Sequence, residues 1–145
     1  MRDGSFELID ESYNGNPASM LAAIAVLALS SVGHRGRRIA VLGDMAELGE
    51  EAPRLHGELA DTLSETGIDK VFTVGRLMAY LDRALPVDIR GEHTETPEEL
   101  VDSVCRELRP GDVVMVKGSL STRMVVLVEA LQHMAQPPLS LAATG

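Results

Sequence analysis

The sequence is poor in residue types that several protein classes require. Its 145 residues include one cysteine, no tryptophan, two tyrosines and two phenylalanines. A single cysteine, Cys105, excludes an intramolecular disulfide framework and a CxxC metal site. Because Cys105 lies in an apolar-periodic stretch, we expect a small buried side chain in a reducing compartment, and hence a cytoplasmic protein. So few aromatic residues also argue against stacking platforms for single-stranded nucleic acid.

Basic residues and long apolar runs are scarce as well. Thirteen Lys and Arg residues stand against 22 Asp and Glu residues, which gives a net charge of −9, and Lys70 and Lys117 are the two lysines. A chain without a basic footprint is a poor nucleic-acid binder, so we expect no nucleic-acid partner. No apolar run approaches the roughly 20 residues that cross a bilayer, and no basic-then-apolar leader opens the sequence. We therefore expect no membrane span.

The length and the apolar content are sufficient for one folded domain. Hydrophobic residues make up 45% of the chain. A chain of this size buries about two-thirds of its surface on folding, enough for a core without disulfides or metals. We expect the domain to occupy residues 1–135. The tail at 136–145, with two prolines and then small residues, is expected to be disordered.

Short apolar runs alternate with helical patterns along the chain, which predicts an α/β fold. Strands are expected at 6–9, 39–42, 71–74, 87–89 and 113–116. Helices are expected from Pro17 to Gly33, at 50–66 and 77–85, from Pro97 to Leu108, and around 124–131. Asn16-Pro17 is a helix start, and Thr96-Pro97-Glu98-Glu99 is a capping box. This alternation favours a doubly wound, mostly parallel sheet with helices on both faces.

Ligand sites in such sheets lie at the carboxyl ends of the strands. Four polar segments follow the predicted strands, namely Asp10-Glu11, Gly43-Asp44, Gly75-Arg76 and Lys117-Gly118-Ser119. Each segment also has an ordinary structural interpretation: a helix cap, a tight turn or a solvated loop. No GxxxxGK[ST] phosphate loop is present in the sequence. The simplest interpretation of His56 is a histidine on a helix surface.

Three sequence blocks at these strand ends resemble the C-terminal domain of the Mur ligases. In chain order they are IDESYNGNP (9–17), VLGDMAELG (41–49) and VKGS (116–119), with His56 after the second block. The resemblance extends over roughly residues 5–132. It implies a Rossmann-like domain of a ligase that uses ATP and magnesium to join D-Ala-D-Ala to UDP-N-acetylmuramoyl-tripeptide, through an acyl phosphate, in peptidoglycan synthesis. The phosphate loop and the magnesium ligands are then expected in a central domain, so this domain alone is expected to be inactive.

The resemblance assigns roles to individual residues. Asp10, Glu11, Tyr13, Asn14 and Asn16 match the loop that lies along the nucleotide, although the family usually has Asp at the position of Glu11. Asp44, Met45 and Glu47 match the second block, and Lys117, Gly118 and Ser119 match the loop that meets the incoming dipeptide. Leu120 and Val125 stand where many members carry Arg and Glu. Neither a catalytic residue nor a metal ligand is expected in this domain alone.

Two alternatives remain open at this point. The chain could be a non-catalytic, flavodoxin-like or receiver-like module, and in a receiver Asp10, Glu11, Asp44 and Lys117 would form the phosphoacceptor pocket. Phosphorylation by acetyl phosphate would identify a receiver. The chain could also come from another Mur ligase or a folylpolyglutamate synthase. A specific response to D-Ala-D-Ala would separate these ligases.

Overall fold

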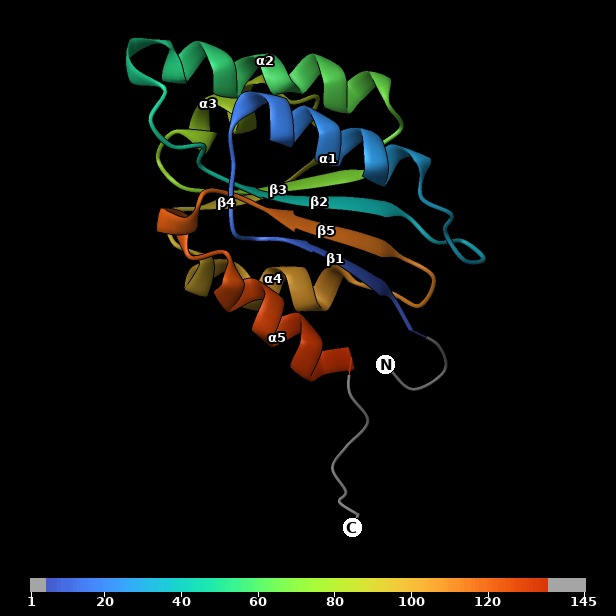
Figure 1. The fold of residues 1–145 in the computed structure, drawn as a ribbon. Helices are drawn as coiled ribbons and strands as arrows, with labels where there is room; N and C mark the ends of the chain where they lie inside the picture. The colour runs from blue at the N-terminus through green and yellow to red at the C-terminus, as the bar shows by residue number, and fades with distance from the viewer. Residues whose placement is uncertain (1–4, 136–145) are drawn as a thin grey trace.

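Five parallel strands form one sheet in the computed structural model, which describes residues 5–135 (Figure 1). The strands are β1 (Glu7–Glu11), β2 (Arg38–Gly43), β3 (Lys70–Val74), β4 (Arg90–Thr94) and β5 (Val113–Lys117). Their order across the sheet is β1-β5-β2-β3-β4, and every neighbouring pair is parallel. The predicted α/β class and parallel sheet are confirmed.

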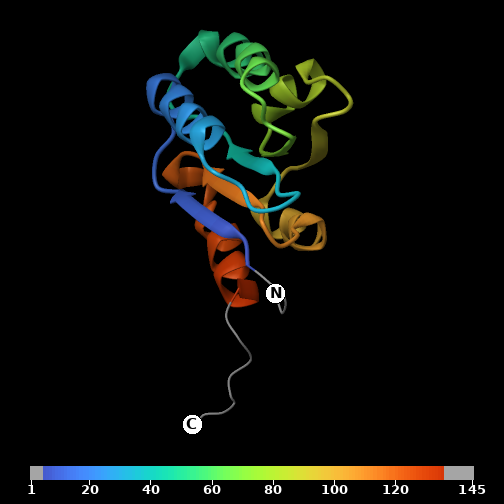
Figure 2. The ribbon, with the colours of Figure 1, turned by 90° about the vertical axis from the view of Figure 1, so that its right-hand side faces the viewer.

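Helices cover both faces of the sheet, as the views from two sides show (Figures 1 and 2). One face carries α1 (Pro17–Leu29), α2 (Ala52–Glu65) and α3 (Met78–Ala84), and the other carries α4 (Pro97–Glu107) and α5 (Val125–Ala135). Two short 3₁₀ turns, η1 (Gly49–Glu51) and η2 (Leu120–Thr122), precede α2 and α5. The central strands β2 and β5 are almost wholly buried, because their side chains enter the core on both faces. This explains their continuous apolar runs.

The path of the chain places β5 in the middle of the sheet. From β1 to β4 the chain crosses with α1, α2 and α3 on one face, and α4 then returns it along the opposite face to β5. Opposite faces are required because parallel crossovers are right-handed. The loop after β5 therefore leaves toward one face, whereas the loops after its neighbours β1 and β2 leave toward the other. Such a reversal opens a crevice at the carboxyl ends of the strands.

The helix starts follow the predicted capping chemistry. Asn16 caps α1: its Oδ1 accepts from the Ser19 amide at 2.9 Å, and the Asn16 amide donates to Ser19 Oγ at 3.1 Å. At α4, Glu99 Oε1 accepts from the amide and the hydroxyl of Thr96, each at 3.0 Å. These bonds satisfy amides that have no partner within the helix. Both predicted caps are confirmed.

Three details of the sequence prediction are wrong, and the largest error is the position of the edge strand β4. The predicted strand 87–89 is not a strand, and Val87 is 80% exposed. The strand begins at Arg90 and has the sequence RGEHT. An edge strand is only partly covered, so it lacks the apolar run that marks a central strand. Helix α1 was predicted to run to Gly33, but it ends at Leu29. Cys105 was predicted to be buried, but it is half-buried against the core beneath α4 and α5.

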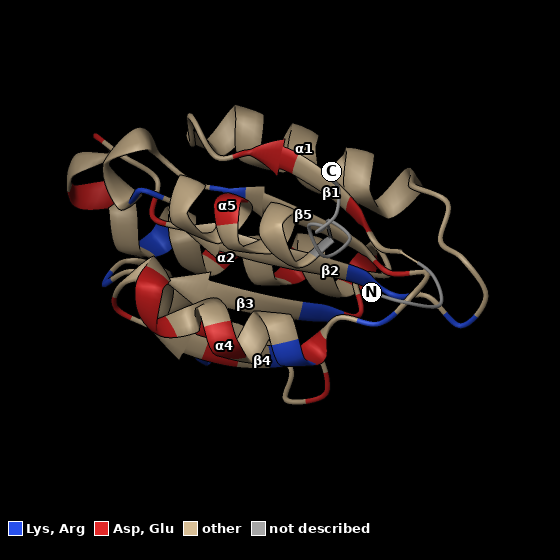
Figure 3. Cartoon of the chain, turned by 90° about the horizontal axis from the view of Figure 1, so that it is seen from below, with Lys and Arg blue, Asp and Glu red and all other residues tan. Residues whose placement is uncertain are grey.

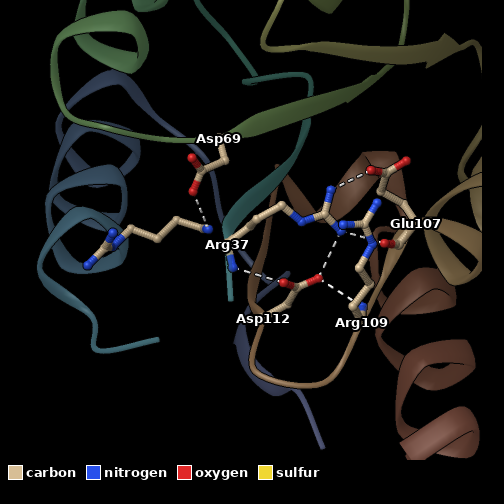
Figure 4. A network of polar contacts seen from close by, with 6 residues as sticks. Arg37, Asp69, Glu107, Arg109 and Asp112 are labelled. Carbon is tan, nitrogen blue, oxygen red and sulfur yellow. Dashed lines mark hydrogen bonds and ion pairs between the residues drawn. The ribbon is translucent and has the colours of Figure 1, made fainter. Parts of the chain in front are cut away.

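A polar network joins the amino ends of β2 and β5, at the edge opposite the crevice (Figure 4). Asp112, 1% exposed, accepts from the Arg37 amide at 2.8 Å and the Arg109 amide at 2.9 Å, and it pairs with the Arg37 guanidinium at 3.1 Å. Arg37 also pairs with Glu107 at 2.6 Å. Burial alone would lower the pKa of Arg37, but the hydrogen bonds to Glu107 and Asp112 outweigh burial and raise it. The network fixes the two central strands in register.

No helix within residues 5–135 is long and apolar enough to cross a membrane. The predicted tail at 136–145 lies outside the described residues.

Candidate functional site

Three loops enclose a cleft of about 540 Å³ at the carboxyl ends of β1, β2 and β5. Its lining comes from the β1–α1 loop (Tyr13, Asn14, Gly15, Asn16), the β2–α2 loop (Ala46, Glu47) and the β5–α5 loop (Ser119, Leu120, Ser121). These loops lie together at the left of Figure 1, although more than 100 residues separate the first from the last. The cleft lies where the direction of the crossovers reverses, as expected for a ligand site in such a sheet.

Backbone contacts hold the three loops against one another. The Ser119 amide donates to the Asp44 carbonyl at 3.0 Å, and the Ala46 amide donates to the Gly15 carbonyl at 3.4 Å. A Cβ atom on Gly15 would lie 2.8 Å from the Ser119 nitrogen and 2.9 Å from the Gly118 carbonyl carbon. Since both neighbours are backbone atoms, only glycine allows this approach. Gly15 was not among the predicted site residues, although Asn-Gly within the first block was a signal for it.

The β1–α1 loop presents polar groups and one aromatic ring. Asp10 Oδ1 accepts from the amide and the hydroxyl of Ser12 at 3.0 and 2.6 Å, which turns the chain out of β1. Tyr13 is 57% exposed and lines the cleft. Asn16 uses its Oδ1 to cap α1, so its side-chain NH₂ group remains as a donor beside the amino end of a 13-residue helix. Such an end favours anionic groups.

The acidic residue of the β2–α2 loop is engaged within the protein. Asp44 accepts from the Met78 amide at 2.8 Å and the Leu77 amide at 3.3 Å, at the start of α3. Gly75 makes room for this carboxylate: a Cβ there would lie 2.4 Å from Asp44 Oδ1. Asp44 is thus a helix cap that fixes the loop, and it does not line the cleft.

His56, in α2, is hydrogen-bonded to the same loop. The Met45 amide donates to His56 Nε2 at 2.9 Å, and His56 Nδ1 lies 2.6 Å from the Ala52 carbonyl. Because Nε2 accepts, the proton is assigned to Nδ1, and the ring is neutral. His56 is 0% exposed, so the prediction of a surface histidine is wrong. The helical spacing of its neighbours did not reveal that this face of α2 packs under the loop.

Lys117 is also buried, contrary to the interpretation of its segment as a solvated loop. Its side chain is 1% exposed. The ammonium donates to Asn14 Oδ1 at 2.8 Å and to the Asn14 carbonyl at 3.1 Å, and it lies 3.5 Å from Glu11 Oε1. Glu11 and Lys117 face each other in register across β1 and β5. The end of β5 is therefore tied to the end of β1.

The structure divides the predicted site residues into two groups. Five of them line the cleft: Tyr13, Asn14, Asn16, Glu47 and Ser119. The other six lie behind or beside the lining: Asp10, Glu11, Asp44, Met45, Lys117 and Gly118. The prediction did not assign four other residues that line the cleft: Gly15, Ala46, Leu120 and Ser121. Leu120 is 73% exposed.

The carboxyl edge of the sheet has a mixed electrostatic character. Figure 3 shows acidic residues at the end of β1, next to α1, which carries no charged residue along its length. Glu47 adds a carboxylate inside the cleft, and its backbone is held at φ +62°. A non-glycine residue in this left-handed region is strained by about 1–3 kcal/mol, and such strain concentrates at functional sites. The cleft combines one carboxylate with amide and hydroxyl donors.

No group of three or more His, Cys, Asp or Glu residues within residues 5–135 is arranged to hold a metal ion. The acids at the carboxyl edge are separated: Asp44 caps α3, Glu11 contacts Lys117, and Glu47 faces the cleft. The described residues therefore do not fit a magnesium site.

Comparison with known families decides the classification. A sequence model of the family described as "Mur ligase, glutamate ligase domain" matches residues 2–120. The chain belongs to the Mur ligase family. The match includes all three blocks that form the cleft, and membership in this family leaves the receiver-like alternative without support.

Several Mur ligases resemble the chain along most of its length. The UDP-N-acetylmuramoyl-tripeptide–D-alanyl-D-alanine ligase of Escherichia coli is 38% identical over 128 residues, covering 87% of this chain and 27% of the relative. The ligase of the same name from Bacillus subtilis is 32% identical over 141 residues, covering 95% and 30%. The chain thus spans less than a third of the length of these relatives.

Solved Mur ligase structures share the fold. A MurF structure from Acinetobacter baumannii has a TM-score of 0.76 and 25% identity, covering 92% of this chain and 29% of that one. MurF from Thermotoga maritima, solved with ADP, has a TM-score of 0.74 and 24% identity, covering 91% and 29%. The architecture is therefore that of a MurF domain.

Proposed function

We propose that this chain is the C-terminal domain of a cytoplasmic ligase that joins D-Ala-D-Ala to UDP-N-acetylmuramoyl-tripeptide at the expense of ATP. The observation that carries the proposal is the convergence of all three sequence blocks on one cleft. Three relatives named for this reaction are 32–38% identical and cover 87–95% of the chain.

In this proposal the β1–α1 side of the cleft meets the nucleotide. Asp10, exposed at the end of β1 beside the cleft, offers ribose hydroxyls the carboxylate oxygen that does not bind Ser12, as acids at strand ends do in nucleotide-binding folds. The exposed Tyr13 ring offers a flat face to the base. Asn14 and Asn16 supply amide donors from the same loop. Since the sequence has no phosphate loop, the triphosphate is held by another part of the ligase, and magnesium, which assists phosphoryl transfer when bound, is held there too.

The incoming dipeptide meets the opposite side of the cleft. The Glu47 carboxylate attracts its ammonium group, and the hydroxyls of Ser119 and Ser121 donate to its carboxylate. The positions of Asp44, Met45 and Gly118 indicate an indirect contribution, because they fix the loops that carry these groups. The chain's own residues thus orient an amine, and the acyl phosphate that the amine attacks forms elsewhere in the ligase.

A domain exchange tests the proposal. The matched region of the Escherichia coli ligase is replaced by residues 5–135 of this chain, and phosphate release is measured with ATP and UDP-N-acetylmuramoyl-tripeptide. We expect release that depends on D-Ala-D-Ala and does not respond to D-Glu or to a diamino acid. A Gly118→Val version is the control that should lose activity. A Cβ at Gly118 would lie 2.7 Å from Met124 Cγ, so the larger side chain should displace the β5–α5 loop. A folded hybrid that responds to another amino acid, or to none, would refute the proposal.

A further inference from the structure

The buried ammonium of Lys117 has its described partners entirely within the β1 end and the loop that follows it. They are Asn14 Oδ1 at 2.8 Å, the Asn14 carbonyl at 3.1 Å and Glu11 Oε1 at 3.5 Å. Burying an ammonium is strongly unfavourable unless it is paired and hydrogen-bonded. Lys117 at the end of β5 can therefore stay buried only while these contacts persist.

The contact with Lys117 fixes which way the Asn14 carboxamide faces. An ammonium has three donors and no acceptor, so the carboxamide must present its oxygen to it. The carboxamide is planar, and its NH₂ group lies on the side away from the oxygen's partner. Asn14 is an exposed residue that lines the cleft. Its two N–H donors are consequently directed away from the buried ammonium.

We propose that Lys117 is a positioning residue that holds the Asn14 carboxamide with its NH₂ group facing the cleft, where it donates to an acceptor oxygen of the bound ligand. The identity of that ligand rests on the proposed function, in which the Asn14 side of the cleft meets the nucleotide, so the oxygen is expected to be the nucleotide's. A contact with the carboxylate of D-Ala-D-Ala is the alternative that the kinetic experiment below distinguishes. Lys117 itself contacts neither. Its effect on binding passes through Asn14.

The orientation of Asn14 is tested without any ligand on the 145-residue chain. In ¹⁵N-labelled protein, the side-chain amide pair of Asn14 should resonate away from free-amide positions. Lys117→Met should move the pair to free-amide values. Lys70→Met is the matched control, because the other lysine lies at the amino end of β3 and should leave the pair unchanged. A wild-type pair at free-amide values, or a pair that Lys117→Met does not move, would overturn the proposal.

The coupling between the two residues is tested by kinetics in the hybrid ligase, with ATP and D-Ala-D-Ala varied in turn. Asn14→Asp retains the oxygen for Lys117 and removes the donor, so it should raise KM for one substrate about tenfold, with kcat changed less. Lys117→Met should raise the same KM, and the double variant should lie within twofold of the worse single variant. Multiplying effects would show that Lys117 acts on the ligand directly and would overturn the proposal.

Which KM rises tells whether the oxygen is the nucleotide's or the dipeptide's. A parent hybrid without D-Ala-D-Ala-dependent activity refutes the proposed function, whereas the resonance experiment still decides the role of Lys117. If Lys117→Met does not fold, Asn14→Asp alone decides: an unchanged KM for both substrates would overturn the proposal.

Discussion

Substitution of Gly15 by alanine should separate two of the loops that form the cleft. The added Cβ would lie 2.8 Å from the Ser119 nitrogen and 2.9 Å from the Gly118 carbonyl carbon. Neither atom belongs to a flexible side chain, so the contact is relieved only by moving backbone. The β5–α5 loop is held by the Ser119 amide, which donates to the Asp44 carbonyl at 3.0 Å. Movement at Gly15 would therefore disturb all three loops together.

The expected magnitude follows from the cost of overpacking. Inserting a methyl group into a closely packed site costs about 1–3 kcal/mol. For a domain of this size, 1 kcal/mol shifts the melting temperature by about 3 °C. We therefore expect Gly15→Ala to lower the melting temperature by about 3–9 °C.

A second glycine in the same chain supplies a control of opposite sign. Gly57 lies within α2, and an added Cβ would meet its nearest neighbour, the Tyr80 carbonyl oxygen, at 3.9 Å. Alanine in a helix is favoured over glycine by about 0.5–1 kcal/mol, so Gly57→Ala should raise the melting temperature by about 1–3 °C. Calorimetry on both variants is the measurement. A Gly15→Ala protein that melts within 1 °C of wild type would refute the packing argument.

Three further changes test the supports of the fold. Asp112→Ala leaves the Arg37 and Arg109 amides without their acceptor and removes one of the two carboxylates that pair with the Arg37 guanidinium. It should lower the free energy of unfolding by about 2–4 kcal/mol in urea denaturation, and a loss under 1 kcal/mol would contradict the network. Asp44→Ala removes the cap of α3, so it should cost about 1 kcal/mol and speed amide exchange at the start of that helix. The hydrogen bond from Arg123 lowers the pKa of Glu98. The stabilisation from this pair is therefore present above the ordinary glutamate pKa and lost as the pH falls through the lowered value. Arg123→Gln should raise the Glu98 pKa, followed by NMR, toward its ordinary value.

Local chemistry was sufficient to predict most helices and the buried strands. The Asn16-Pro17 start, the Thr96–Glu99 capping box and the apolar runs of β2, β3 and β5 depend on contacts within a few residues or on burial from both faces. Such features leave a pattern that can be recognised in the sequence alone. The edge strand β4 was misplaced for the same reason, since a half-covered strand carries a weaker pattern.

The parallel alternation and the glycine-containing blocks also located the edge of the sheet at which the site lies. Residues such as Tyr13, Glu47 and Ser119 were named from sequence, and the structure brings them into one cleft. Their convergence was expected because the carboxyl ends of parallel strands share an edge.

Tertiary structure alone decided which polar residues face that cleft and which lie beneath it. Lys117, Asp44 and His56 all looked like candidates for exposed groups, and each is instead bonded inside the protein. The partner of Lys117 is 103 residues away along the chain. It becomes a neighbour only because α4 returns the chain to place β5 between β1 and β2. A charge's burial depends on such distant partners, whereas local patterns record only the residue's own neighbours in sequence.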